Sequence, residues 1–167
     1  GCEQPNYPMP FANVSINGSP AVTANSMGLF ACAPVGGTAV TQLQSPTIRI
    51  ADACGAVNET MTCSASGGLD LAVNLGTNCT VPAGHSAGDT KASRSCFWSA
   101  NRRKEHARAW LPGNVWVNTT QTQVNSNVNN TCNAGWTVSQ QLNMYRAGNG
   151  CNNTCEVAGV VQHEWGH

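Results

Sequence analysis

The stretch VAGVVQHEWGH, residues 157–167, decides the fold of this chain, because it joins an apolar run to two histidines four residues apart. The apolar run predicts a helix that crosses a protein interior and begins near residue 156. Residues four apart on a helix lie on the same face, one turn from each other. We therefore expect the imidazoles of His163 and His167 to point to the same side.

Two imidazoles placed in this way can bind a single Zn²⁺ at about 2.1 Å. Glu164 follows His163 and is expected beside the metal rather than on it, where it can act as the general base that takes a proton from water. HExxH alone is only moderately specific, so a pair of solvent-facing histidines is the alternative. The zinc interpretation is favoured because the motif follows an apolar run and holds two of only four histidines.

The residues before this motif predict several further elements. The longest helical stretch covers residues 92–110, with Asp89 or Thr90 as its N-cap and Pro112-Gly113 ending it. Within it, Arg102, Arg103, Lys104 and Glu105 are expected to form a solvated face. Residues 115–117 predict a strand, 125–130 a turn or loop, 132–136 and 141–145 the arms of a hairpin, and 148–150 a turn.

The order of CNAGW at 132–136, NMY at 143–145, a glycine-rich turn and HEWGH resembles the region before the zinc helix of thermolysin-like and fungalysin-like metallopeptidases, the gluzincins. In that family an Asn-Ala-x-Trp segment forms the edge strand of the cleft, and peptide substrates add to it by backbone hydrogen bonds. The resemblance implies that Asn133 and Ala134 bind substrate backbone. It also implies that the helix over 93–108 is the aromatic-rich helix that precedes this strand.

The resemblance covers about residues 89–167, and HEWGH is closer to the fungalysin-like form. The family takes its third zinc ligand, a Glu, from a helix after HExxH, and a transition-state-stabilising His or Tyr from further downstream. We therefore expect a C-terminal segment missing from this sequence to supply the third ligand. Gly135 stands where the family has a bulkier residue, and the cysteines are not typical of thermolysin.

Residues 1–84 read as β-rich, with candidate strands at 11–16, 27–32, 47–51 and 69–73 separated by Gly, Pro, Asn and Ser. We predict an α+β fold with two regions. A β-rich N-terminal region, 1–84, precedes the first part of a zincin-like catalytic domain, 85–167, which contains the aromatic-rich helix, the edge strand and the HExxH helix.

Composition limits the class of protein. Eight Lys and Arg balance eight Asp and Glu, which gives no electrostatic footprint for nucleic acid, and no run is long enough to span a membrane. Nine cysteines indicate an oxidising, extracellular compartment and at least three disulfides. Cys151 and Cys155 are expected in disulfides rather than on a metal, and Cys54 and Cys63 could pair locally.

Several other residues are candidates for metal sites. His85 and His106 could be additional zinc ligands, although a lone polar histidine is more often a surface group. Asp89 could bind calcium, but a helix cap is the simpler role. With Asp89 and His85, Glu156 is the remaining candidate for a third zinc ligand within the chain.

Two functions follow from these observations. The first is a secreted zinc endopeptidase that hydrolyses peptide bonds with Glu164 as general base. The alternative is a non-catalytic extracellular structural or adhesive protein that keeps a peptidase-like fold, because a fold does not dictate function.

Overall fold

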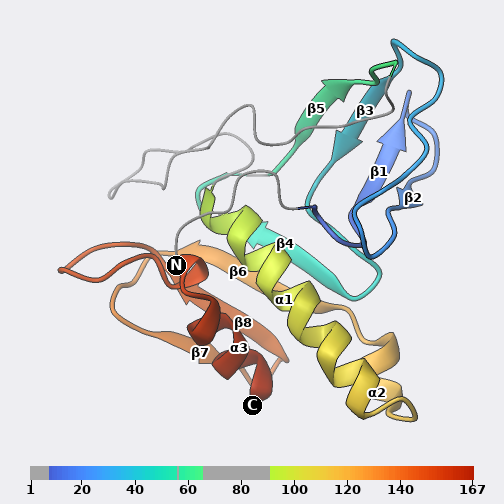
Figure 1. Cartoon of the computed structure of the whole chain (residues 1–167). Helices are drawn as coiled ribbons and strands as arrows, with labels where there is room; N and C mark the ends of the chain where they lie inside the picture. The colour runs from blue at the N-terminus through green and yellow to red at the C-terminus, as the bar shows by residue number, and fades with distance from the viewer. Residues whose placement is uncertain (1–7, 56, 66–90) are drawn as a thin grey trace.

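The half of the chain that carries the HExxH motif folds around a mixed sheet. The computed structural model describes residues 8–55, 57–65 and 91–167, which form an α+β fold with two four-stranded sheets (Figure 1). The mixed sheet has the order β4-β6-β8-β7 and contains β4 (Ile48–Asp52), β6 (Thr122–Val128), β7 (Ala134–Trp136) and β8 (Gln141–Tyr145). Strands β4, β6 and β8 run parallel, whereas the edge strand β7 is antiparallel to β8.

Helices α1 (Lys91–Trp110) and α3 (Ala158–Gly166) cover one face of this sheet and contact each other (Figure 1). Their apolar sides meet inward-facing strand residues in the main core. The fully buried members are Leu43, Ile48, Ala92, Cys96, Phe97, Ala100, Val124, Leu142, Met144, Cys155 and Val161. Burial of this surface is the main force that holds the two helices to the sheet.

The second sheet is antiparallel, has the order β2-β1-β3-β5 and lies at the other end of the molecule (Figure 1). Its strands are β1 (Asn13–Ile16), β2 (Val22–Thr23), β3 (Thr38–Thr41) and β5 (Glu59–Thr62). A smaller core of Val14, Cys32, Ala39 and Cys63 lies beneath it. Strand β4 comes from the same part of the sequence but belongs to the mixed sheet, so residues before 84 contribute to both sheets. The expected boundary at residue 84 lies outside the described residues.

The strand predictions for this part of the chain succeed in two places. Strands β1 and β4 confirm the predictions for 11–16 and 47–51, and the candidate at 69–73 lies outside the described residues. The strand predicted at 27–32 is wrong. There the Asn25 side chain accepts the backbone N–H groups of Met27 and Leu29, and Gly28 has a φ of +70°, so the chain turns. Strands β2, β3 and β5 were not predicted.

Two predictions in the second half are also wrong, and asparagine explains both. Residues 115–117 begin the short helix α2 (Val115–Thr119) instead of a strand, because the Asn114 side chain accepts the Val117 N–H and caps it. The loop predicted at 125–130 is largely the end of β6. Its Asn125 side chain donates across to Gln141 Oε1 at 3.1 Å and Asn143 Oδ1 at 2.7 Å, so it supports the sheet.

The remaining predictions for this half are confirmed. Helix α1 matches the helix expected at 92–110, and its predicted caps Asp89 and Thr90 lie outside the described residues. Strands β7 and β8 form the predicted hairpin. The predicted turn at 148–150 is closed by paired backbone hydrogen bonds between Gly148 and Cys151. A short 3₁₀ helix, η2 (Thr154–Glu156), precedes α3.

Disulfides connect the elements, as the cysteine content indicates. Three join described residues: Cys32–Cys63, Cys96–Cys155 and Cys132–Cys151. The prediction of at least three disulfides, which include both Cys151 and Cys155, is therefore confirmed. Cys54 is also disulfide-bonded, but a local Cys54–Cys63 pair is wrong because Cys63 bonds to Cys32.

No helix within residues 8–55, 57–65 and 91–167 is both long enough and apolar enough to cross a bilayer.

Candidate functional site

The two histidines of the motif lie together on the exposed side of α3. The Nε2 atoms of His163 and His167 are 3.2 Å apart, and their ring planes meet at 89°. Both side chains are exposed. The predicted helix and the shared direction of the two imidazoles are thus confirmed: α3 runs from Ala158 to Gly166 and carries His163, and His167 is its C-cap.

The separation of these nitrogens fits one metal ion. Two nitrogens that each lie 2.0–2.1 Å from a tetrahedral ion are about 3.3–3.4 Å apart. The observed Nε2–Nε2 distance of 3.2 Å requires almost no movement to reach that value. The same atoms can share a proton as a hydrogen bond between neutral rings, depending on the tautomer. The pair therefore presents two convergent nitrogen donors to the solvent.

Glu164 differs from its two neighbours in its surroundings. Its side chain is only 8% exposed. Among the hydrogen bonds and ion pairs formed by the described residues, none involves the Glu164 carboxylate. A carboxylate whose lone pairs are not used in other hydrogen bonds can act as the acceptor for a water molecule held beside it.

The edge strand β7 lies next to this helix (Figure 1). Ala134 is the first residue of β7, 8% exposed and paired with Met144, while Asn133 immediately before it is exposed. In the described part of the chain, β7 pairs only with β8, so its outer edge carries backbone groups without a strand partner. The structure thus places Asn133 and Ala134 at the start of an edge strand that contacts α3.

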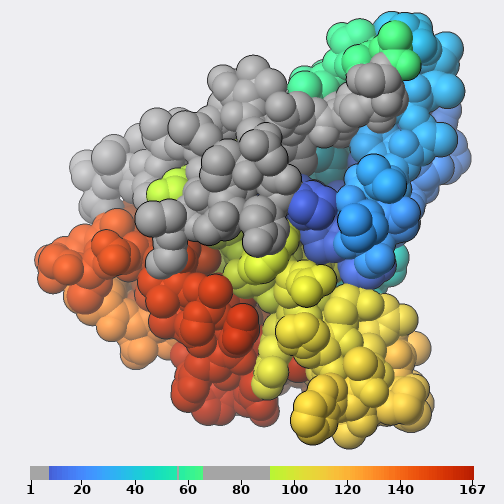
Figure 2. Space-filling model, in the orientation of Figure 1, coloured from blue at the N-terminus to red at the C-terminus, as the bar shows by residue number. Residues whose placement is uncertain are grey.

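Three tryptophans connect β7, α3 and α2. The Trp116 ring meets Trp136 of β7 edge-on at 6.1 Å between ring centroids, and it meets Trp165 of α3 at 5.9 Å. Trp116 Nε1 donates to Gln140 Oε1 at 2.8 Å. Figure 2 accordingly shows the red α3 surface and the yellow α2 surface on the same face of the molecule. The sequence offered one signal of this cluster, the five tryptophans, but no periodicity that would connect them.

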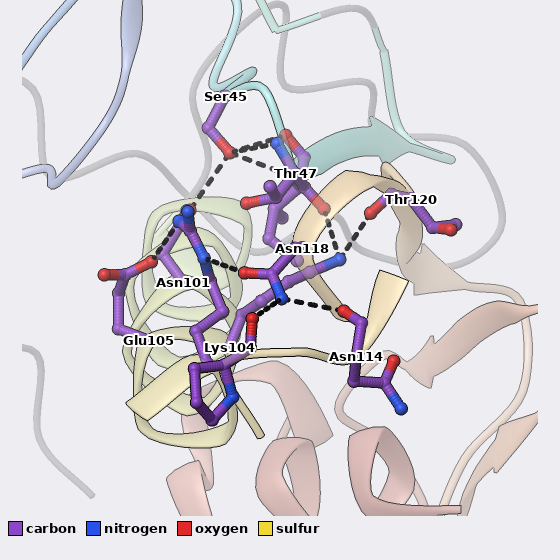
Figure 3. A network of polar contacts seen from close by, with 11 residues as sticks. Ser45, Thr47, Asn101, Lys104, Glu105, Asn114, Asn118 and Thr120 are labelled. Carbon is purple, nitrogen blue, oxygen red and sulfur yellow. Dashed lines mark hydrogen bonds and ion pairs between the residues drawn. The ribbon is translucent and has the colours of Figure 1, made fainter. Parts of the chain in front are cut away.

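Lys104 lies beneath Trp116 and is completely buried, which corrects its predicted place on a solvated face. Its Nζ donates to the backbone carbonyls of Thr47, at 3.3 Å, and Thr120, and lies 5.2 Å from the centre of the Trp116 ring (Figure 3). Figure 3 also shows Asn101 accepting from Ser45 at 3.0 Å, so this polar network joins α1 to the segment before β4. Burial, and secondly the charge of Arg108, lower the pKa of Lys104 to about 8.

This lowered pKa predicts a specific dependence of stability on pH. In the unfolded chain Lys104 keeps its proton to about pH 10.5, whereas in the folded protein it releases the proton near pH 8. The unfolded state therefore binds more protons in that window, and the free energy of unfolding should rise with pH from 8 to 10.5. The neutral amine still has two N–H donors for the two carbonyls. We expect Lys104 to raise the free energy of unfolding by at most about 3 kcal/mol over this pH range.

Urea unfolding of the wild type and of Lys104→Met, with free thiols blocked, measures this contribution at each pH. The difference between the two proteins cancels the titration of all other groups. Curves of unfolding free energy against pH that stay parallel from pH 8 upward would contradict the assigned pKa.

The other candidate metal ligands are not gathered at the histidine pair. His106 is exposed on α1, and Glu156 forms an ion pair with Lys91 at 2.8 Å. His85 and Asp89 lie outside the described residues. Within the ranges that the structure describes, no group of three or more His, Cys, Asp and Glu side chains could hold a metal ion.

No known protein family matches this chain, and no curated protein or solved structure was found to be similar to it.

Proposed function

We propose that this chain is part of a secreted zinc-dependent endopeptidase. The observation that carries the proposal is the pair of exposed imidazoles whose Nε2 atoms lie 3.2 Å apart, with Glu164 between them in sequence. That spacing suits one tetrahedral ion. The disulfides support an extracellular location, since such bonds persist in oxidising compartments.

Each proposed site residue has a separate chemical role. His163 and His167 would hold zinc, which when bound lowers the pKa of a water molecule and polarises a carbonyl oxygen. Glu164 accepts the proton of the attacking water and later returns it to the leaving amine. Asn133 and the outer edge of β7 hold the substrate backbone as an added strand.

A catalytic zinc site needs three protein ligands and one open position. The described residues supply two of these ligands, both from α3. The third, an acidic residue in the family that the motif resembles, is proposed to come from outside the described residues, most simply from a following segment. Trp116, which contacts both Trp165 of α3 and Trp136 of β7, would then keep α3 at a fixed distance from β7.

The test uses the natural secreted protein and its variants, with zinc measured by mass spectrometry and cleavage measured on an unfolded protein substrate. His163→Ala should lower zinc affinity by more than the roughly 10–100-fold that loss of a supporting contact costs, and should abolish cleavage. His106→Ala, an exposed histidine on α1, is the matched control and should change neither.

Stoichiometric zinc that survives His163→Ala would overturn the proposal. A wild-type protein that binds no zinc and cleaves nothing would favour the alternative, a non-catalytic extracellular scaffold with a peptidase-like fold.

A further inference from the structure

The disulfide Cys132–Cys151 lies directly before the edge strand that the proposed function assigns to substrate binding. Cys132 precedes Asn133, and its φ of +62° turns the chain into β7. Cys151 closes the turn that follows β8. The bond therefore joins the two ends of the β7–β8 hairpin, across a sequence separation of 19 residues.

Ala134 is held by its pairing with Met144 and by its burial in the main core, whereas Cys132 and Asn133 before it are exposed. The Asn149 side chain donates to Thr131 Oγ1 at 2.9 Å, and Gly148 lies so close to Thr131 that an added Cβ would come within 2.6 Å of its methyl group. The strand itself has three residues and one strand neighbour among the described elements. The disulfide is the only covalent link between the segment around Asn133 and the rest of the hairpin other than the chain itself, within the described residues.

Its exposure distinguishes this disulfide from the other two whose partners are both described. Cys132 is exposed and Cys151 half-buried, whereas Cys96 and Cys155 are completely buried, and Cys32 and Cys63 are 8% and 1% exposed. A thiolate must reach a sulfur atom to open a disulfide. The most exposed of the three disulfides should therefore react fastest with a thiol. Cys132–Cys151 should open first.

We propose that the Cys132–Cys151 disulfide is a redox-sensitive positioning element for the substrate-binding edge strand. This inference rests on the proposed function. With the bond closed, Asn133 and β7 are held in an extended conformation ready to pair with a peptide. With the bond open, binding must also order this segment, so substrate affinity falls while the metal site on α3 stays intact.

The opening step needs a dithiol reductant from outside the protein. Its thiolate attacks one sulfur and forms a mixed disulfide, and its second thiol then displaces the protein sulfur. The bond between Cys132 and Cys151 breaks, both residues become thiols, and the reductant closes to a disulfide. Two electrons and two protons pass from the reductant to the protein.

The experiment compares the natural protein with Cys132→Ala/Cys151→Ala and, as a matched control, Cys32→Ala/Cys63→Ala in the smaller core beneath the antiparallel sheet. KM and kcat for a peptide substrate, zinc content, and amide hydrogen exchange of residues 133–136 are measured on each. We expect KM of the first variant to rise about tenfold, the effect of ordering roughly one backbone residue on binding, with kcat and zinc content unchanged. Amide hydrogen exchange of residues 133–136 should become about tenfold faster.

The control variant should show neither change, and brief treatment of the wild type with dithiothreitol should reproduce the first variant. An unchanged KM in an active protein, or unchanged exchange at 133–136, would overturn the positioning role. An inactive wild type would overturn the proposed peptidase instead, and hydrogen exchange would still decide whether the disulfide holds the strand.

Discussion

Replacement of Glu164 by glutamine in the natural protein should lower the rate of peptide hydrolysis by about 10²–10⁴-fold or more, the usual contribution of general-base catalysis, while zinc stays bound. The amide has the size of the carboxylate but cannot take a proton from water. It also leaves His163 and His167 in place on α3. Because glutamine has nearly the same shape and Glu164 forms no ion pair among the described residues, the substitution should not disturb the helix although the side chain is only 8% exposed.

Turnover and metal content must be measured on the same preparation. Glu105→Gln is a suitable control, because Glu105 lies on α1, outside the motif, and pairs with Arg108 at 2.8 Å. It should retain activity. Full activity in Glu164→Gln would remove this residue from the mechanism, and loss of zinc would show that the carboxylate is a ligand.

Local sequence patterns were sufficient for the elements that carry the motif. The apolar run before His163 predicted α3, and the spacing of the two histidines predicted that their rings converge. The hairpin of β7 and β8 followed from two short apolar arms with a turn between them. In each case the signal lies within a dozen residues, which is the range over which periodicity determines secondary structure.

Local patterns gave wrong secondary structure in the asparagine-rich segments. Asn114 could equally end a strand or begin a helix, and only its hydrogen bond to the Val117 N–H decides for α2. Asn125 reads as a loop residue, yet in β6 its amide bridges to two residues of β8. Asn127 is fully buried, and its side chain donates to both carboxylate oxygens of Asp52 at 3.0 and 3.1 Å. The roles of Asn125 and Asn127 depend on partners far away in the sequence.

The candidate site was predictable only as far as its local motif. The sequence predicted a solvent-exposed Lys104 because its neighbours along the chain are charged. Its neighbours at helical spacing, Phe97 and Asn101, are buried. Its burial against Trp116 depends on where α2 packs, which no pattern in the sequence specifies. The tryptophan cluster could not be predicted for the same reason: its members come from three elements whose packing no local pattern specifies.

Loss of the Cys96–Cys155 disulfide should cause the largest change in stability. The bond joins α1 to η2, directly before α3, and both cysteines are completely buried. It closes a sequence separation of 59 residues, for which the chain-entropy relation gives about 4 kcal/mol. Domains are typically stable by about 5–15 kcal/mol, so Cys96→Ala/Cys155→Ala should lose a large part of the total free energy of unfolding.

Urea unfolding measures this loss, and zinc titration shows its consequence for the site. Without the bond, η2 and the first turn of α3 depend on core contacts and on the Asn153 cap, which accepts the Cys155 N–H at 3.0 Å. The helix then frays more easily at its beginning, and the two imidazoles spend less time converged, so zinc affinity should fall as well. Cys32→Ala/Cys63→Ala opens a bond across a separation of 31 residues in the smaller core beneath the other sheet. It should lower stability but leave zinc affinity unchanged, because that core is separate from the one that holds α1 and α3. Equal zinc affinities in the two variants would show that α3 is held by its core packing, chiefly Val161 and Trp165, and not by the disulfide before it.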